Sequence, residues 1–133
     1  EKKIAILCKQ HKIYSILCQK LNINWRNILS QRLLPDEAIF FNKEKRCVII
    51  EKKYQTGPGS VEEKLQTCEF KLYQYKRLLE PSGVSVELIY VLNKSWFNNS
   101  RFRDVFQFMK KKNCPYYFDE IPMDVIFGNY LRD

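Results

Sequence analysis

The chain has 133 residues, of which 45% are hydrophobic and 14% aromatic. This composition is sufficient for a buried core and excludes an intrinsically disordered chain, and the length predicts one domain over residues 1–133. No apolar run approaches the roughly 20 residues that cross a bilayer, and charges interrupt the first residues too early for a secretory leader. Five cysteines without a CxxC pair indicate reduced thiols. We therefore expect a soluble protein of a reducing, cytoplasmic compartment with no membrane partner.

The positive charge is concentrated near the N-terminus. Residues 1–35 hold seven lysines and arginines against one glutamate, so they carry +6 of the net charge of +8. Lysine, arginine and interleaved aromatic residues suit a nucleic-acid backbone, because cations displace condensed counterions and flat side chains lie against sugars or bases. A solvated basic helix face is the alternative, and membrane surfaces also attract lysine. The residues of this segment predicted to contact DNA are Lys9, Lys12, Arg26 and Arg32.

Two helical segments are predicted before the composition changes at Pro35. Over residues 4–21, apolar residues and cysteines recur at spacings of three and four, which predicts a helix with a break near His11. A second helix is predicted over residues 25–33, because proline disfavours helical geometry in the residue that precedes it. Together these patterns predict a basic helical segment over about residues 1–34.

Runs rich in β-branched and aromatic residues follow. AIFFN (38–42) and RCVIIEKKY (46–54) flank a polar KEK and predict an antiparallel hairpin. A helix is predicted over residues 60–79, because Ser60 and Glu63 match a capping box and apolar residues then recur at helical spacing. The later elements predicted are a buried strand, an amphipathic helix and a short strand, at residues 84–92, 101–112 and 114–118. This order predicts an α/β (α+β) fold with a mixed central β-sheet flanked by helices.

The end of the second hairpin strand carries the residues most suggestive of chemistry. Side chains of a strand alternate between its faces, so Glu51, Lys53 and Gln55 share one face. Asp36 opens the partner strand, and the hairpin can bring its carboxylate close to Glu51. Carboxylate oxygens hold Mg²⁺, and an ammonium can orient a water and stabilise charge on a phosphoryl transition state. The alternative is an ordinary Glu–Lys pair on an exposed hairpin.

The stretch LLPDEAIFFNKEKRCVIIEKKYQ, followed by a helix and a buried strand, resembles the PD-(D/E)XK nuclease superfamily over residues 35–92. The resemblance implies a restriction-endonuclease-like core with Asp36 and Glu51 as metal ligands and Lys53 as the catalytic lysine. It implies the backbone carbonyl of Lys52 as a further ligand and Mg²⁺ as the cofactor, with Mn²⁺ able to substitute.

Four details of the resemblance stay open. Gln55 is a possible addition to the site, and Glu37 competes with Asp36 as the first ligand. The strand that precedes the Asp-bearing strand in this superfamily is not evident from the sequence. Many members also carry an acidic residue on the first helix, a role that is either absent here or filled by Glu1.

The resemblance implies a Mg²⁺-dependent endonuclease of the restriction type, which hydrolyses phosphodiester bonds of double-stranded DNA and acts either alone or as a homodimer. The alternatives are a repair or junction nuclease, a non-catalytic DNA-binding module with the same fold, and a basic protein-interaction domain. Other candidate sites are weaker. His11 is the only histidine and lacks acidic or cysteine neighbours at metal spacing, and GPGS (57–60) lacks the lysine of a phosphate-binding loop. Asp119, Glu120 and Asp124 are predicted to be surface acids.

Overall fold

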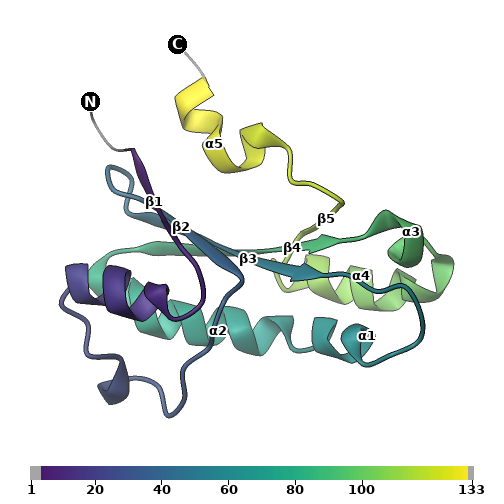
Figure 1. Cartoon of the computed structure of the whole chain (residues 1–133), viewed down its shortest axis with the longest axis horizontal. Coiled ribbons are helices and arrows are strands. Elements are labelled where there is room, and N and C mark those ends of the chain that lie inside the picture. The colour runs from purple at the N-terminus through teal and green to yellow at the C-terminus, as the bar shows by residue number, and fades with distance from the viewer. Residues whose placement is uncertain (1–3, 132–133) are drawn as a thin grey trace.

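The computed structural model describes residues 4–131 and contains a five-stranded mixed sheet (Figure 1). The strands follow the chain order across the sheet, β1-β2-β3-β4-β5. Their bounds are Ala5–Cys8 for β1, Glu37–Phe41 for β2, Arg46–Lys53 for β3, Ser85–Leu92 for β4 and Tyr116–Phe118 for β5. The prediction of an α/β protein with a mixed central sheet and helices is confirmed.

The sheet combines an antiparallel half with a parallel half. β1, β2 and β3 pair antiparallel, and β4 and β5 then add parallel to β3. The predicted β2–β3 hairpin is confirmed, and its tight turn includes Lys45 with a positive φ of 51°. The chain between β3 and β4 passes through the helices α1 (Val61–Leu65) and α2 (Cys68–Leu79), since parallel neighbours need a crossover connection.

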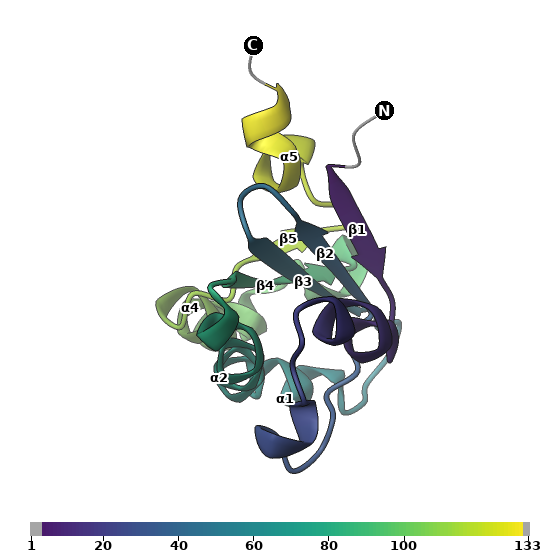
Figure 2. The same cartoon turned by 90° about the vertical axis from the view of Figure 1, so that its left-hand side faces the viewer.

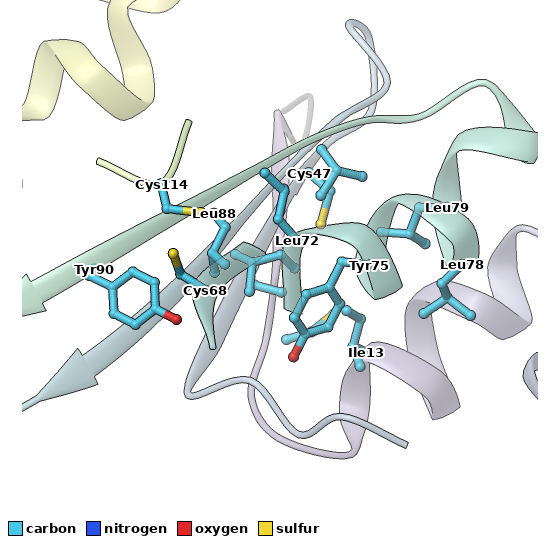
Figure 3. Packing of buried hydrophobic residues seen from close by; sticks show 14 of the residues in the cluster. Ile13, Cys47, Cys68, Leu72, Tyr75, Leu78, Leu79, Leu88, Tyr90 and Cys114 are labelled. Carbon is cyan, nitrogen blue, oxygen red and sulfur yellow. The ribbon is translucent and has the colours of Figure 1, made fainter. Parts of the chain in front are cut away.

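The two faces of the sheet bury different clusters. On one face, residues such as Cys47, Ile49 and Leu88 pack against Tyr75 and Leu79 of α2, as Figure 3 shows for part of this cluster. On the other face, a smaller cluster packs against α5 (Met123–Leu131). Figures 1 and 2 show α5 above the sheet and α1, α2 and α4 below it. We name these the α2 face and the α5 face.

The prediction of a helix over residues 4–21 is wrong in its first part. Ala5–Cys8 forms β1, which pairs with β2 from Ala5 opposite Phe41 to Cys8 opposite Ala38. Helical spacing of a few apolar residues is a weak signal over so short a run, and pairing with β2 satisfies the backbone instead. The break near His11 and the helix after it are confirmed, the latter as the π-helix η1 (Ile13–Cys18). The N-terminal segment is therefore only partly helical.

The predicted helix over residues 25–33 is also wrong, because only one 3₁₀ turn forms, η2 (Trp25–Asn27). Its continuation is bound by groups from elsewhere in the chain. The Ile28 carbonyl accepts a hydrogen bond from Arg77 (2.7 Å), and the Tyr14 hydroxyl bonds both backbone groups of Leu33. These contacts hold residues 28–33 in a loop that leads to β2.

The predicted helix over residues 60–79 is two helices, interrupted at residues 66–67. Thr67 donates its hydroxyl to the Lys64 carbonyl (2.7 Å), a local bond that competes with the helical pattern. The capping box does not form, since the Ser60 side chain makes no capping hydrogen bond. Leu65 of α1 and Cys68 of α2 both remain in the α2-face core.

The C-terminal third contains the predicted helix and short strand together with helices that the sequence pattern did not predict. α4 (Arg103–Lys111) and β5 confirm the predictions. α3 (Lys94–Phe97) follows β4, and α5 follows β5. The 3₁₀ helices η3 (Glu80–Ser82) and η4 (Ser100–Phe102) precede β4 and α4, respectively. None of the helices within residues 4–131 has the length and apolarity that crossing a bilayer requires. All five cysteines are buried and free, as predicted.

Candidate active site

Asp36 and Glu51 meet where β2 begins and β3 nears its end. Glu37 pairs with Ile50 in the antiparallel register, so continuing that register by one residue places Asp36 opposite Glu51. Directly opposed residues of an antiparallel pair lie on the same face with Cβ atoms about 5 Å apart. The face is the α2 face, because Ile49, two residues before Glu51, belongs to its core. The two carboxylates predicted from sequence are therefore neighbours.

Hydrogen bonds tie these two residues to each other's strand. The backbone N–H of Asp36 donates to Oε2 of Glu51 (3.3 Å), and the backbone N–H of Lys52 donates to Oδ2 of Asp36 (2.7 Å). Bonds from N–H groups to a carboxylate are stronger than those between neutral partners. Glu51 is only 4% exposed, so its charge depends on such donors. This environment is unlike that of an ordinary surface glutamate.

Strand alternation separates the remaining charged residues of the motif. Lys53 follows Glu51 on the α2 face, opposite Leu92 in the parallel register, and it is partly exposed. Lys52 and Glu37 point to the α5 face, where their side chains form an ion pair (2.7 Å). The hydrogen bond that Lys52 donates to Glu37 within this ion pair is the main cause of the raised pKa of Lys52. The structure therefore places Glu37 on the opposite face from Glu51 and leaves Asp36 as its carboxylate neighbour.

Lys71 on α2 is a residue of this site that sequence reasoning missed. Its Nζ lies 3.2 Å from Oε1 of Glu51, and both side chains are largely buried. Lys71 follows Cys68 by three residues and precedes Tyr75 by four, so it stands on the apolar stripe of the helix. A lysine at an inward-facing position was the available signal, because an ammonium there requires a partner.

Gln55 also lies at this end of the α2 face, held by the loop that follows β3. Its backbone N–H donates to Asn93 Oδ1 (2.8 Å), and Asn93 Nδ2 donates to the Gln55 carbonyl (2.6 Å). Its side-chain amide donates to the Gly57 carbonyl, and a Cβ on Gly59 would stand 3.1 Å from Nε2. Within GPGS (57–60), Gly59 therefore lies against the Gln55 side chain. The Oε1 atom of Gln55 is buried without a hydrogen-bond partner within residues 4–131.

Two buried tyrosines border the carboxylate of Glu51. Burial, followed by the negative charge of Glu51, raises the pKa of Tyr75 on α2. Burial also raises the pKa of Tyr90, which pairs with Glu51 in the parallel register and receives smaller contributions from Cys68 and Glu51. Figure 3 shows both rings on the α2 face, one from the helix and one from the sheet. Both phenols therefore stay protonated at neutral pH.

The donor chemistry of the site suits a hard divalent cation. Asp36 and Glu51 offer carboxylate oxygens, and the backbone carbonyl of Lys52 directly follows Glu51 on β3. Mg²⁺ is commonly held by one or two carboxylates and keeps several waters. Within residues 4–131 no group of three or more His, Cys, Asp or Glu side chains is arranged to hold a metal. A metal here would therefore rely on two carboxylates, a backbone carbonyl and water.

The remaining predicted site residues lie elsewhere. Glu1, considered as an extra acidic ligand, lies outside the described residues, and no acid occurs on η1. Asp119, Glu120 and Asp124 are exposed, as predicted, and the first two line a hollow on the α5 face with Glu37 and Lys52. The predicted DNA contacts Lys9, Lys12, Arg26 and Arg32 are all exposed.

Comparison with known proteins adds no family assignment. Family models, curated protein sequences and solved structures all lack a significant match to this chain.

Proposed function

We propose that this chain is a Mg²⁺-dependent DNA endonuclease of the PD-(D/E)XK type with a restriction-endonuclease-like core. The observation that carries the proposal is the placement of Asp36 opposite Glu51 on one face, with Lys53 following on that same face. An ordinary exposed hairpin would leave both carboxylates in water, whereas Glu51 is buried and bound by protein donors. A buried carboxylate beside a second carboxylate at a strand end is an arrangement typical of functional sites.

Each residue has a distinct task in this proposal. Asp36, Glu51 and the carbonyl of Lys52 hold the cation, which when bound polarises the phosphate and lowers the pKa of a bound water. The ammonium of Lys53 orients the attacking water and stabilises the negative charge that develops on the phosphoryl oxygens. The hydrogen bond from the Lys52 backbone to Asp36 fixes the first carboxylate against the second strand.

The fold supports the same proposal through β1. The resemblance implied a strand before the Asp-bearing strand, and β1 occupies that position, antiparallel to β2. The order β1, β2, β3, crossover helix, β4 then matches the sequence of elements that the resemblance implies. The basic N-terminal segment supplies positive charge near the same strands, which suits a double-stranded DNA substrate. Restriction-type cleavage, action as a homodimer and use of Mn²⁺ in place of Mg²⁺ belong to this proposal.

The proposal is tested by cleavage of plasmid, genomic and single-stranded DNA with Mg²⁺ and with EDTA. We expect cleavage with Mg²⁺ only, and a fall of at least about 100-fold for Lys53→Ala, the effect of removing a group that stabilises transition-state charge. Lys43→Ala removes the same charge from the exposed β2–β3 turn and should leave the rate within about twofold. Cleavage by Lys53→Ala at the wild-type rate would contradict the assignment.

A non-catalytic DNA-binding module is the second candidate. The observation that favours it is the ion pair of Lys71 with Glu51, because the ammonium already neutralises the carboxylate that a metal would need. DNA binding in EDTA combined with intact DNA after incubation with Mg²⁺ across many sequences would establish this candidate and exclude the nuclease.

A further inference from the structure

A second hollow of the molecule lies outside the carboxylate site, between η1 and η2. It has a volume of about 460 Å³, and its lining includes His11, Tyr14, Trp25, Arg26 and Arg32. None of its lining residues is acidic, and the described part of the chain before Asp36 contains no acidic residue. We name this hollow the arginine pocket.

Trp25 holds the two guanidinium groups of the pocket. The guanidinium carbon of Arg26 lies 4.8 Å from the centroid of the Trp25 ring, and that of Arg32 lies 5.6 Å from it. Cation–π contacts restrict these long side chains before a ligand arrives, which lowers the conformational entropy lost on binding. Within residues 4–131 neither guanidinium forms an ion pair with a carboxylate. Two arginines that contact the same aromatic ring and lack an acidic partner form a site for an anion.

Planar guanidinium groups bind anions with oxygen acceptors best. Each presents N–H donors in a fixed fork whose geometry fits the oxygens of a phosphate or carboxylate. The pocket also offers His11, Ser15 and Gln19 at its rim as further polar groups. A lipid surface would favour an exposed lysine patch, whereas this site is concave and arginine-lined. A phosphate group of a nucleic-acid strand fits the concavity, the charge and the aromatic wall together.

The segment from Arg32 to Asp36 connects the arginine pocket to the carboxylate site, and hydrogen bonds hold it in place. The Tyr14 hydroxyl donates to the Leu33 carbonyl (2.7 Å) and accepts from the Leu33 backbone N–H (2.8 Å). Burial raises the pKa of Tyr14 to about 12, so the hydroxyl keeps the proton that this pair of bonds needs. The Gln10 backbone N–H donates to the Pro35 carbonyl (2.9 Å). The loop between Arg32 and Asp36 is therefore fixed at two points.

The spacing suits one strand of nucleic acid. Four residues of extended chain span at most about 14 Å between the Cα atoms of Arg32 and Asp36. Successive phosphates of one strand rise about 3.4 Å along a DNA helix axis, so this span corresponds to a few nucleotides. We infer that the arginine pocket binds a backbone phosphate of the strand that enters the Asp36–Glu51 site, a few nucleotides from the scissile bond. This inference rests on the proposed function for the identity of that strand.

The test measures binding without cleavage. A labelled DNA duplex of mixed sequence is titrated with protein in EDTA, with fluorescence anisotropy as the signal and salt concentration varied. For Arg26→Ala/Arg32→Ala we expect binding about tenfold weaker or worse, and a slope of log K against log salt smaller by about one to two. Neither side chain makes a structural hydrogen bond or ion pair among the described residues, so the fold should persist.

The matched control is Arg103→Ala/Lys110→Ala, which removes the same charge from the exposed surface of α4. Its slope should remain near that of the wild type. Equal losses for both double variants, or no loss for Arg26→Ala/Arg32→Ala, would overturn the inference. The outcome is independent of catalysis. If DNA binding depends on the arginine pocket but the protein never cleaves DNA with Mg²⁺, only the proposed nuclease function is refuted. If the protein cleaves DNA but its binding does not depend on Arg26 and Arg32, only the role of the arginine pocket is refuted.

Discussion

The two faces of the sheet at the end of β3 carry similar charged residues in different surroundings. On the α2 face, Glu51 is buried and accepts bonds from Lys71 and from the backbone of Asp36. On the α5 face, the Glu37 and Lys52 side chains, 20% and 52% exposed, pair with each other beside an open hollow. The chemistry of the residue types is the same on both faces. The difference in burial and donors is what marks one face as a candidate site.

Adjacent residues on opposite faces give the sharpest test of this comparison. We expect Asp36→Asn to lower the rate of Mg²⁺-dependent DNA cleavage by at least about 100-fold, because the variant loses a charged metal ligand. Glu37→Gln removes the same charge one residue away on the α5 face and should change the rate by about twofold or less. The measurement is the initial rate of plasmid nicking and linearisation. The reverse ranking would move the first ligand to Glu37 and the site to the other face.

Lys71 provides the next largest effect, on stability. Lys71→Met leaves the buried Glu51 carboxylate without its ammonium partner, which should lower the free energy of unfolding by about 1–3 kcal/mol without metal. Mn²⁺ should then stabilise this variant more than the wild type, because the metal no longer competes with an ammonium for Glu51. Urea unfolding with and without Mn²⁺ measures both effects. Unchanged stability together with an unchanged response to Mn²⁺ would show that the ion pair has no energetic role.

A third prediction concerns the packing of Gly59 against the Gln55 side chain beside the candidate site. Gly59→Ala places a methyl group 3.1 Å from the Gln55 amide nitrogen and should destabilise the protein by about 1 kcal/mol, since the buried amide must move. Gly57→Ala is the matched control, because nothing lies within 4 Å of a Cβ there. Thermal unfolding of both variants gives the comparison. Equal melting temperatures of the two variants would mean that a methyl group at position 59 does not displace the Gln55 amide.

The smallest effect is expected from the ion pair on the α5 face. Glu37→Gln should lower stability by less than about 1 kcal/mol, as is usual for exposed pairs. The hydrogen bond to Glu37 raises the pKa of Lys52, so the contribution is complete below the ordinary lysine value of 10.5 and is lost as the pH rises through the higher folded-state pKa. Urea unfolding of wild type and variant should therefore differ at neutral pH and converge in strongly alkaline buffer. A larger difference in alkali would contradict this sign.

The sequence was most informative where local pattern and tertiary contacts agree. The β2–β3 hairpin and the strand β4 follow from apolar runs and a polar turn, and alternation along β3 placed Glu51 with Lys53 correctly. β1 was not predicted because a four-residue strand pairs only with a distant partner and its spacing also fits a helix. The N-terminal loop was missed for a similar reason, since Tyr14 and Arg77 bind its backbone from other elements.

The candidate site shows the same limit. The register that sets Asp36 opposite Glu51 depends on the length of the turn between β2 and β3, which the sequence suggests only approximately. Lys71 lies 20 residues beyond Glu51 and reaches it only because α2 packs across the sheet. No local sequence pattern predicts the contact between Lys71 and Glu51. An inward-facing lysine on an apolar stripe signals a buried partner and does not identify it.

Binding of Mn²⁺ measured by titration calorimetry tests the central claim most directly, because it depends on no recognition sequence. The wild type and Glu37→Gln should bind the ion with the same affinity, and Glu51→Gln, which keeps the shape of the side chain, should bind it at least about tenfold more weakly. A wild type that binds no Mn²⁺, or equal binding by all three proteins, would contradict a metal site built from Asp36 and Glu51.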